Sequence, residues 1–291
     1  MKKIIVPIDF SECSTNAVRY ACSLAKHIQA ELLILYVHES EVIVSETLVW
    51  QFYEGILPLP QIVHEQMAFV KSIASDQGVI AHTYIVEGNF NEAVTELSME
   101  HHGDLVVMGT EGITYAYTSV WGTHTSQLIA KKKIPVLVVP KNFKGILDQN
   151  AIFVFATDFK GIDYIPDFFI ELTQTLNAKL HIFSDVDPYR DEIDKKIETK
   201  EFEYLKELFP GSEVTMNHTY KLNLIHAVED FASKNHTSLI MMISHHRGFM
   251  GNLFHQSVTK QMALHTAIPF LAVPDAMEEV STSVSNSGFV G

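Results

Sequence analysis

Short hydrophobic runs alternate with amphipathic stretches along most of the chain. Runs of four to seven residues rich in β-branched side chains, such as "KIIVPID", "ELLILYV" and "DLVVMG", are typical of strands buried on both faces. Between such runs, apolar residues recur on one helical face. The two clearest stripes are Ala17, Val18, Ala21, Leu24 and Ala25, and Ile165, Phe168, Phe169, Leu172 and Leu176. A strand followed by a helix, five times over, predicts an α/β doubly wound parallel sheet, with ligand sites outside the carboxyl ends of its strands.

This pattern occurs twice in the 291 residues. "KKIIVPIDFSE" matches "AIFVFATDFKG", "NEAVTELSMEHHGDLVVM" matches "IHAVEDFASKNHTSLIMM", and "KKKIPVLVVP" matches "HTAIPFLAVP". The first copy carries about 15 extra residues, between roughly Val42 and Pro60. We expect a first domain over residues 1–141, a short polar linker, a second domain over 150–275, and a mobile tail over 276–291.

Composition excludes several classes of protein. A formal charge of −14 argues against a nucleic-acid surface, which normally needs a basic face. The first apolar run breaks at Pro7 and Asp9, so it suits neither a signal peptide nor a membrane span. Cys13 and Cys22, the two cysteines, lie too far apart along one predicted helix for a disulfide. Free thiols indicate a reducing compartment, and we expect a cytoplasmic protein with no membrane contact.

Three glycines follow the fourth hydrophobic run of the first copy. In "MGTEGITYAYTSVWGTHTSQ", Gly109 ends the expected strand, Gly112 follows it, and Gly122 precedes the next helix. A glycine-rich turn between strand and helix lets backbone N–H groups converge on phosphate oxygens, and the helix dipole favours the anion. The hydroxyls of Thr123 and Thr125 can donate to phosphate or join a Mg²⁺ shell. Turns also use glycine for conformational reasons alone, so the spacing by itself leaves both interpretations open.

The spacing G-x2-G-x9-G-[ST], with its preceding strand and the following "IPVLVVP", resembles the ATP-binding signature of the universal stress protein family. The likeness extends over nearly the whole chain and includes "VPIDFSE" with Asp9. It implies two Rossmann-like domains of the adenine nucleotide alpha hydrolase type, each with five parallel strands, related by pseudo-twofold symmetry. Pairing in the family commonly uses the last strands, here "PVLVVP" and "PFLAVP". We therefore expect an intramolecular pseudodimer, and leave a homodimer open.

The resemblance also implies roles for residues of the first copy. Asp9 and the backbone of Val37 would recognise the adenine and nearby atoms. Pro7 and Ile8 would line the base, and Met108 would lie near the ribose. The phosphates would be held by Gly109, Gly112, Gly122, Thr123 and the backbones of His124 and Thr125. The alternatives are structural: Asp9 as a cap of the first helix, with Val37 and Met108 as ordinary core residues.

The second copy lacks these glycines. Ile243, His246 and Gln256 fall on their positions, while Ser257 keeps a hydroxyl and Asp158 keeps the carboxylate. Bulky side chains at these positions should block the close approach of backbone to phosphate. We therefore do not expect the second domain to bind ATP in the manner of the family.

Two stretches of the sequence contain residues that could contact a metal ion. Glu111 lies between the first-copy glycines, where a carboxylate beside phosphates requires a bridging Mg²⁺ or lowers affinity. In the second copy, His245, His246 and His255 are candidate metal ligands in one loop. Their spacing matches no zinc motif, and a hydrogen-bonded loop is the simpler interpretation.

Together these features predict a tandem universal stress protein that binds ATP, or ADP or AMP, with Mg²⁺ in its first domain. It would act in nucleotide-responsive stress signalling through an unidentified protein partner. No Ser-His-Asp order, acid pair or P-loop lysine is present, so at most slow ATP hydrolysis is expected. The alternatives are a nucleotide-independent interaction module and an enzyme that cleaves ATP between its α and β phosphates. The insertion around Trp50 would pack on its own domain or form a contact surface.

Overall fold

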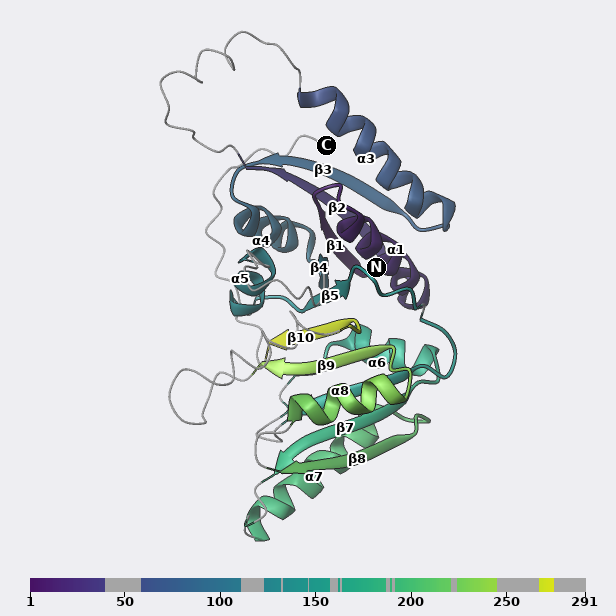
Figure 1. Cartoon of the computed structure of the whole chain (residues 1–291), viewed down its shortest axis with the longest axis vertical. Coiled ribbons are helices and arrows are strands. Elements are labelled where there is room, and N and C mark those ends of the chain that lie inside the picture. The colour runs from purple at the N-terminus through teal and green to yellow at the C-terminus, as the bar shows by residue number, and fades with distance from the viewer. Residues whose placement is uncertain are drawn as a thin grey trace.

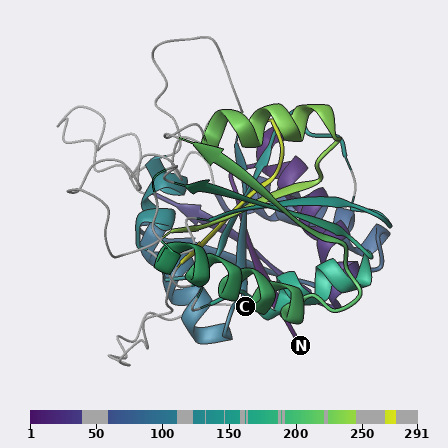
Figure 2. The ribbon, with the colours of Figure 1, turned by 90° about the horizontal axis from the view of Figure 1, so that it is seen from below.

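The fold is a twisted sheet with helices on both faces (Figure 1; Figure 2). The computed structural model describes residues 1–39, 59–110, 123–131, 133–145, 147–157, 162, 164–186, 189, 192–220, 224–244 and 267–274. Within these residues the strands form one ten-stranded sheet in the order β3-β2-β1-β4-β5-β10-β9-β6-β7-β8. The insertion around Trp50 and the C-terminal tail lie outside the described residues.

Each half of the sheet has the same strand order, running 3-2-1-4-5 from its outer edge to the centre. The first half contains β1 (Lys3–Ile8), α1 (Glu12–Ile28), β2 (Glu31–His38), α3 (Leu59–Asp76), β3 (Ala81–Glu87), α4 (Phe90–His101), β4 (Leu105–Thr110), α5 (Thr123–Lys131) and β5 (Val136–Pro140). The second contains β6 (Ile152–Thr157), α6 (Asp167–Thr175), β7 (Lys179–Val186), α7 (Glu192–Leu208), β8 (Val214–Tyr220), α8 (Leu224–Lys234), β9 (Leu239–Ser244) and β10 (Phe270–Pro274). Neighbouring strands within each half are parallel, which confirms the predicted doubly wound fold.

Local sequence explains where the first helix begins and ends. Ser11 is the N-cap of α1, and its hydroxyl accepts a hydrogen bond from the backbone N–H of Ser14. The helix ends at its C-cap residue Gln29, whose backbone adopts the left-handed conformation with φ of 51°. In the second half, α6 begins only after Pro166, so Ile165 and Leu176 of the predicted stripe are buried but lie outside the helix.

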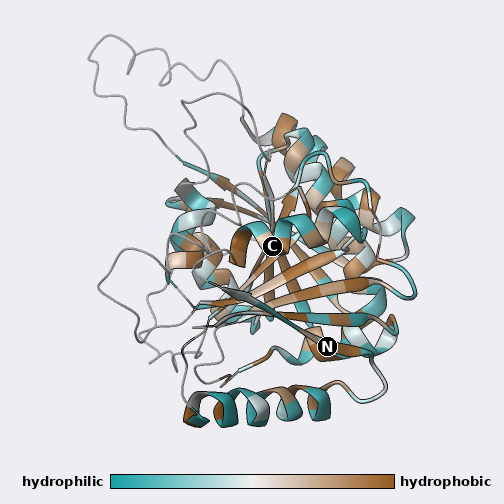
Figure 3. Ribbon diagram, turned by 60° about the horizontal axis from the view of Figure 1, so that its bottom comes forward, coloured by the Kyte–Doolittle hydropathy of each residue, from teal (hydrophilic) through white to brown (hydrophobic). Residues whose placement is uncertain are grey.

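Two hydrophobic layers sandwich the sheet. One layer lies between the sheet and α1, α3, α6 and α7, and the other lies between the sheet and α4, α5 and α8. Figure 3 shows strands that are hydrophobic along most of their length and helices that alternate between hydrophobic and hydrophilic residues. This agrees with strands covered on both faces and helices covered on one.

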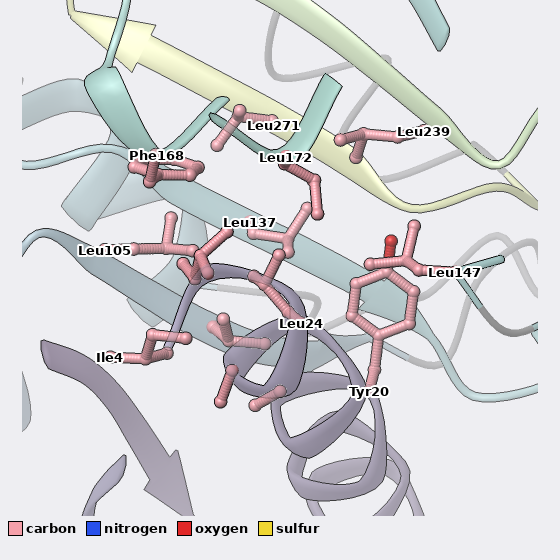
Figure 4. Packing of buried hydrophobic residues seen from close by; sticks show 14 of the residues in the cluster. Ile4, Tyr20, Leu24, Leu105, Leu137, Leu147, Phe168, Leu172, Leu239 and Leu271 are labelled. Carbon is pink, nitrogen blue, oxygen red and sulfur yellow. The ribbon is translucent and has the colours of Figure 1, made fainter. Parts of the chain in front are cut away.

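The two halves are joined by antiparallel pairing of β5 with β10, in which Leu137 lies opposite Leu271. This is the intramolecular pairing of the last strands that the family resemblance implied. The core runs through the junction without interruption, because Leu24 of α1 and Phe168 and Leu172 of α6 belong to one cluster (Figure 4). Beside it, Lys2 forms an ion pair with Glu171 of the other half.

The segment between the halves is less polar in its contacts than predicted. Leu147 is buried in the shared core, and its carbonyl oxygen lies 2.9 Å from Nε2 of His27 on α1. The Asn16 amide donates hydrogen bonds to the carbonyls of Pro140 and Phe143. These hydrogen bonds and the burial of Leu147 therefore hold the linker against α1 at the junction.

Among the described helices, none combines the length and the apolar character that crossing a bilayer requires.

We expect a fragment of residues 1–141 to be unable to remain a folded monomer. It would expose the β5 edge and the apolar surface that packs against α6, and both should drive self-association. Size-exclusion chromatography with light scattering would show dimers or aggregates at concentrations where the full chain shows no such change. A folded, monomeric fragment would contradict this view of the junction.

Candidate functional site

The candidate residues of the first half gather where β2, β1 and β4 end. These three strands are adjacent and parallel, so their carboxyl ends lie at one edge of the sheet. From β1 the chain passes to α1 on one face, and from β4 it passes towards α5 on the other. The edge between β1 and β4 is thus the point at which the winding changes direction, where open α/β sheets place their ligands.

Asp9 lies directly after β1 and is held by the start of α1. Its Oδ1 accepts hydrogen bonds from the backbone N–H of Ser11 at 3.0 Å and from the Ser11 hydroxyl at 2.6 Å. Partial burial opposes the charge, but hydrogen bonds from Ser11 and Ser14 outweigh it and hold the pKa of the Asp9 carboxyl below its ordinary value. The group is therefore a fixed carboxylate at neutral pH, and it also orients the N-cap residue.

Three candidate side chains flank the α4 and α5 side of the sheet. Met108 belongs to the hydrophobic cluster on that side, and Val37 packs against it. Pro7 lies on β1 between Val6 and Ile8, which both face α1, so strand alternation places it on the α4 side. Ile8 is 5% exposed beneath α1, which leaves its backbone as the part available to a ligand.

Two aromatic residues that the sequence analysis missed cover the ends of β1 and β2. Phe10 adopts a left-handed conformation with φ of 62°, and its ring stacks on Tyr36 with centroids 4.8 Å apart. A non-glycine residue rarely adopts this conformation, so the turn from β1 into α1 is held by its surroundings. The signal in the sequence was an aromatic residue immediately after Asp9, but its partner on β2 could be found only from the fold.

Gly109 has a packing role that is visible in the structure. A Cβ atom at this position would lie 2.5 Å from the carbonyl oxygen of Cys13, in the first turn of α1. The equivalent residue of the second half, Ile243, is 5% exposed and belongs to the core on the α6 side. In the second half, β6 ends at Thr157 and α6 begins only at Asp167, whereas α1 begins four residues after β1 ends. The first turn of α1, which contacts Gly109, therefore has no helical counterpart among the described residues.

The first turn of α5 brings further candidate residues to this edge. The Thr125 hydroxyl is directed into the core, where it donates to the sulfur of Met108 at 3.8 Å, so the part of Thr125 available to a ligand is its backbone. The His124 ring lies 4.3 Å from the ring of Phe90 and its Nε2 is 3.8 Å from a carboxylate oxygen of Glu39. Glu39 also accepts a hydrogen bond from the Phe90 N–H at 2.8 Å.

Glu39 is the second feature that sequence reasoning missed. Its carboxylate connects the end of β2 to the first turns of both α4 and α5, segments far apart in the chain. Gly112, Gly122, Glu111 and the side chain of Thr123 lie outside the described residues.

The second-half candidates His245, His246, His255, Asp158 and Ser257 are likewise outside the described residues. Within the residues that are described, no group of three or more His, Cys, Asp or Glu side chains is arranged to hold a metal ion.

Comparison with known proteins identifies the family of the chain. The profile of the universal stress protein family matches residues 1–140. A universal stress protein from Methanocaldococcus jannaschii is 32% identical over 142 residues, which cover 48% of this chain and 82% of that protein. The chain belongs to the universal stress protein family.

Solved structures extend the likeness beyond the first half. A universal stress protein from Archaeoglobus fulgidus has a TM-score of 0.72 with 16% identity, and the match covers 94% of this chain and 98% of that one. The tandem architecture therefore occurs in another protein at low sequence identity. A universal stress protein solved in complex with cAMP matches 48% of this chain and 98% of its own length, with 23% identity and a TM-score of 0.38.

We expect Gly109→Ala to destabilise the protein in the absence of any nucleotide. The added methyl group would press on the backbone of Cys13, and overpacking of this kind costs roughly 1–3 kcal/mol. Urea unfolding of the ligand-free protein measures the loss. An unchanged midpoint would show that the contact with α1 relaxes without cost.

We expect Asp9→Asn to lose stability at neutral pH and to approach wild type in acid. A carboxyl group with a lowered folded-state pKa stabilises the protein above its unfolded value of 3.8, and this stabilisation is lost as the pH falls through the folded-state pKa. Urea unfolding of both proteins between about pH 3 and pH 7 tests this. A difference between the two that is independent of pH would contradict the assignment.

Proposed function

We propose that the first half of this universal stress protein binds an adenine nucleotide, with ATP as the expected ligand, at the carboxyl edge of β2, β1 and β4. The observation that supports this most is the joining of a fixed Asp9 carboxylate, the Gly109 end of β4 and the first turn of α5 at one edge of the sheet. The glycine-rich stretch between Gly109 and Thr123 then supplies backbone donors for the phosphates.

Each candidate has a separate task in this proposal. Asp9 and the Val37 backbone recognise the base, Pro7 and the Ile8 backbone line it, and Met108 packs near the ribose. The phosphates take backbone donors from the remaining residues: Gly109, Gly112, Gly122, Thr123, His124 and Thr125. The domain over 150–275, without these glycines, supports the fold across the junction and does not bind nucleotide in this way.

Magnesium fits the charges around this edge. Glu39 lies beside His124, and Glu111 belongs to the glycine-rich stretch, so two carboxylates accompany the proposed site for a nucleoside triphosphate. A divalent cation bound to the phosphates offsets that repulsion, and Thr123 and the carboxylates offer the oxygen ligands that Mg²⁺ prefers. Occupancy would then alter the Glu39 contact that joins α4 to α5, and so the surface shown to a partner protein in a stress response.

A second candidate function is an interaction module that binds no nucleotide. The contact of Gly109 with α1 favours it, because packing alone accounts for one of the three glycines. The two functions differ in what Gly122 does, because only a phosphate site requires close approach at that position.

We expect isothermal titration with Mg-ATP to show one site per chain, and Gly122→Val to weaken it by roughly tenfold or more because a branched side chain blocks the phosphates. ADP, AMP and cAMP, titrated in parallel, rank the ligands. Gln256→Val, the equivalent change in the second half, is the matched control and should leave the affinity unchanged. A protein that is purified without bound nucleotide and binds none of these nucleotides would favour the interaction module.

A further inference from the structure

Helices α3 and α7 occupy corresponding positions at the two ends of the sheet (Figure 1). Their buried residues follow the same spacing, i, i+4, i+7 and i+11. These residues are Val63, Met67, Val70 and Ala74 beneath α3, and Glu198, the partly buried Phe202, Leu205 and Phe209 beneath and just after α7. This spacing aligns the two helices residue by residue, with Val63 equivalent to Glu198.

The alignment brings two exposed hydrophobic pairs into register. Ile62 and Phe69 of α3 are 58% and 61% exposed, and their equivalents on α7, Ile197 and Tyr204, are 46% and 44% exposed. In both helices the aliphatic residue precedes the aromatic residue by two turns, so the pair lies along one side of the helix. We call these pairs the α3 stripe and the α7 stripe.

A charged residue lies on the same flank of each stripe, between its two hydrophobic residues, and its sign differs between the two. The opposite flank carries Gln66 on α3 and Glu201 on α7. Glu65 lies three residues after Ile62, and Lys200 lies three residues after Ile197. Both side chains are exposed, and Glu65 accepts a hydrogen bond from the Gln61 amide at 3.2 Å. Two α3 stripes placed antiparallel would bring Glu65 near its copy, and two α7 stripes placed antiparallel would do the same with Lys200.

We propose that the α3 stripe of one copy of this chain docks against the α7 stripe of a second copy. In an antiparallel arrangement Ile62 faces Tyr204, Phe69 faces Ile197, and the charges of Glu65 and Lys200 come together at the centre. Association of helices through such side chains is ordinary ridge-and-groove packing. In the antiparallel arrangement Glu65 meets Lys200 and Gln66 meets Glu201, which favours α3 with α7 over either antiparallel like pair.

The geometry makes this contact intermolecular and head to tail. The two stripes lie at opposite ends of the ten-stranded sheet, so one chain cannot join its own pair (Figure 1). A contact between two different surfaces closes into a ring or continues as an open assembly. Each stripe offers few side chains compared with a standard interface, so the association is weak and depends on concentration.

Sedimentation velocity of the full chain over a wide concentration range tests the proposal. The average mass should rise above that of one chain, and Phe69→Ser or Tyr204→Ser should lower the association constant by roughly tenfold or more, because aromatic anchors dominate small interfaces. Circular dichroism and urea unfolding of each variant verify that it is folded, which is expected because these side chains are exposed.

Charge reversal tests the pairing of the two stripes. Glu65→Lys and Lys200→Glu should each weaken association, and the double variant should restore it towards wild type, because only the double variant again pairs opposite charges. Lys71→Glu is the matched control on another side of α3 and should change nothing.

Three results would overturn the proposal. One is a chain that stays monomeric at every concentration, as it would if another segment of the same chain covered the α3 stripe. The second is association that is unaffected by Phe69→Ser and Tyr204→Ser. The third is a double charge reversal that fails to restore association, which would mean that the stripes do not pair with each other.

Discussion

The antiparallel pairing of β5 with β10 is the contact on which the rest of this structure depends. It converts two five-stranded sheets into one and buries the edge that each half would otherwise expose. It also brings α1 against α6, so that Leu24, Phe168 and Leu172 form part of one core. Stability in the first half, where the candidate site lies, therefore depends on apolar residues supplied by the second.

At the candidate site, Gly109 has a packing role in the fold and a proposed role in binding. Gly109 leaves room for the first turn of α1, and that turn holds Asp9 through Ser11. Among the described residues of the second half no equivalent demand is seen, because α6 begins at Asp167 and Ile243 is buried in the core at the matching position. Gly109 and the early start of α1 therefore depend on each other, and the proposed phosphate site lies next to their contact.

The two halves have also diverged beneath their outer helices. Where α3 buries Val63, α7 buries Glu198, whose carboxylate lies 3.1 Å from Nδ1 of His218 on β8. A carboxylate and an imidazole in this position gain less from burial than an apolar pair, because both polar groups must first lose their hydration. The exposed stripes of the same helices instead keep their aliphatic and aromatic character and differ in the charge between them.

Much of the architecture was predictable because it rests on local periodicity. The hydrophobic runs predicted the strands, and the repeated pattern with its resemblance predicted pairing of the last strands. Contacts between distant segments were not predictable in this way: the stacking of Phe10 on Tyr36, the contact of Glu39 with both His124 and Phe90, and the burial of Leu147 in the junction. The sequence by itself determined which residues form strands and helices and which residue types could bind phosphate. Only the tertiary structure decided that Gly109 must accommodate α1 and that the Thr125 hydroxyl is directed into the core, because such distances depend on how separate elements pack together.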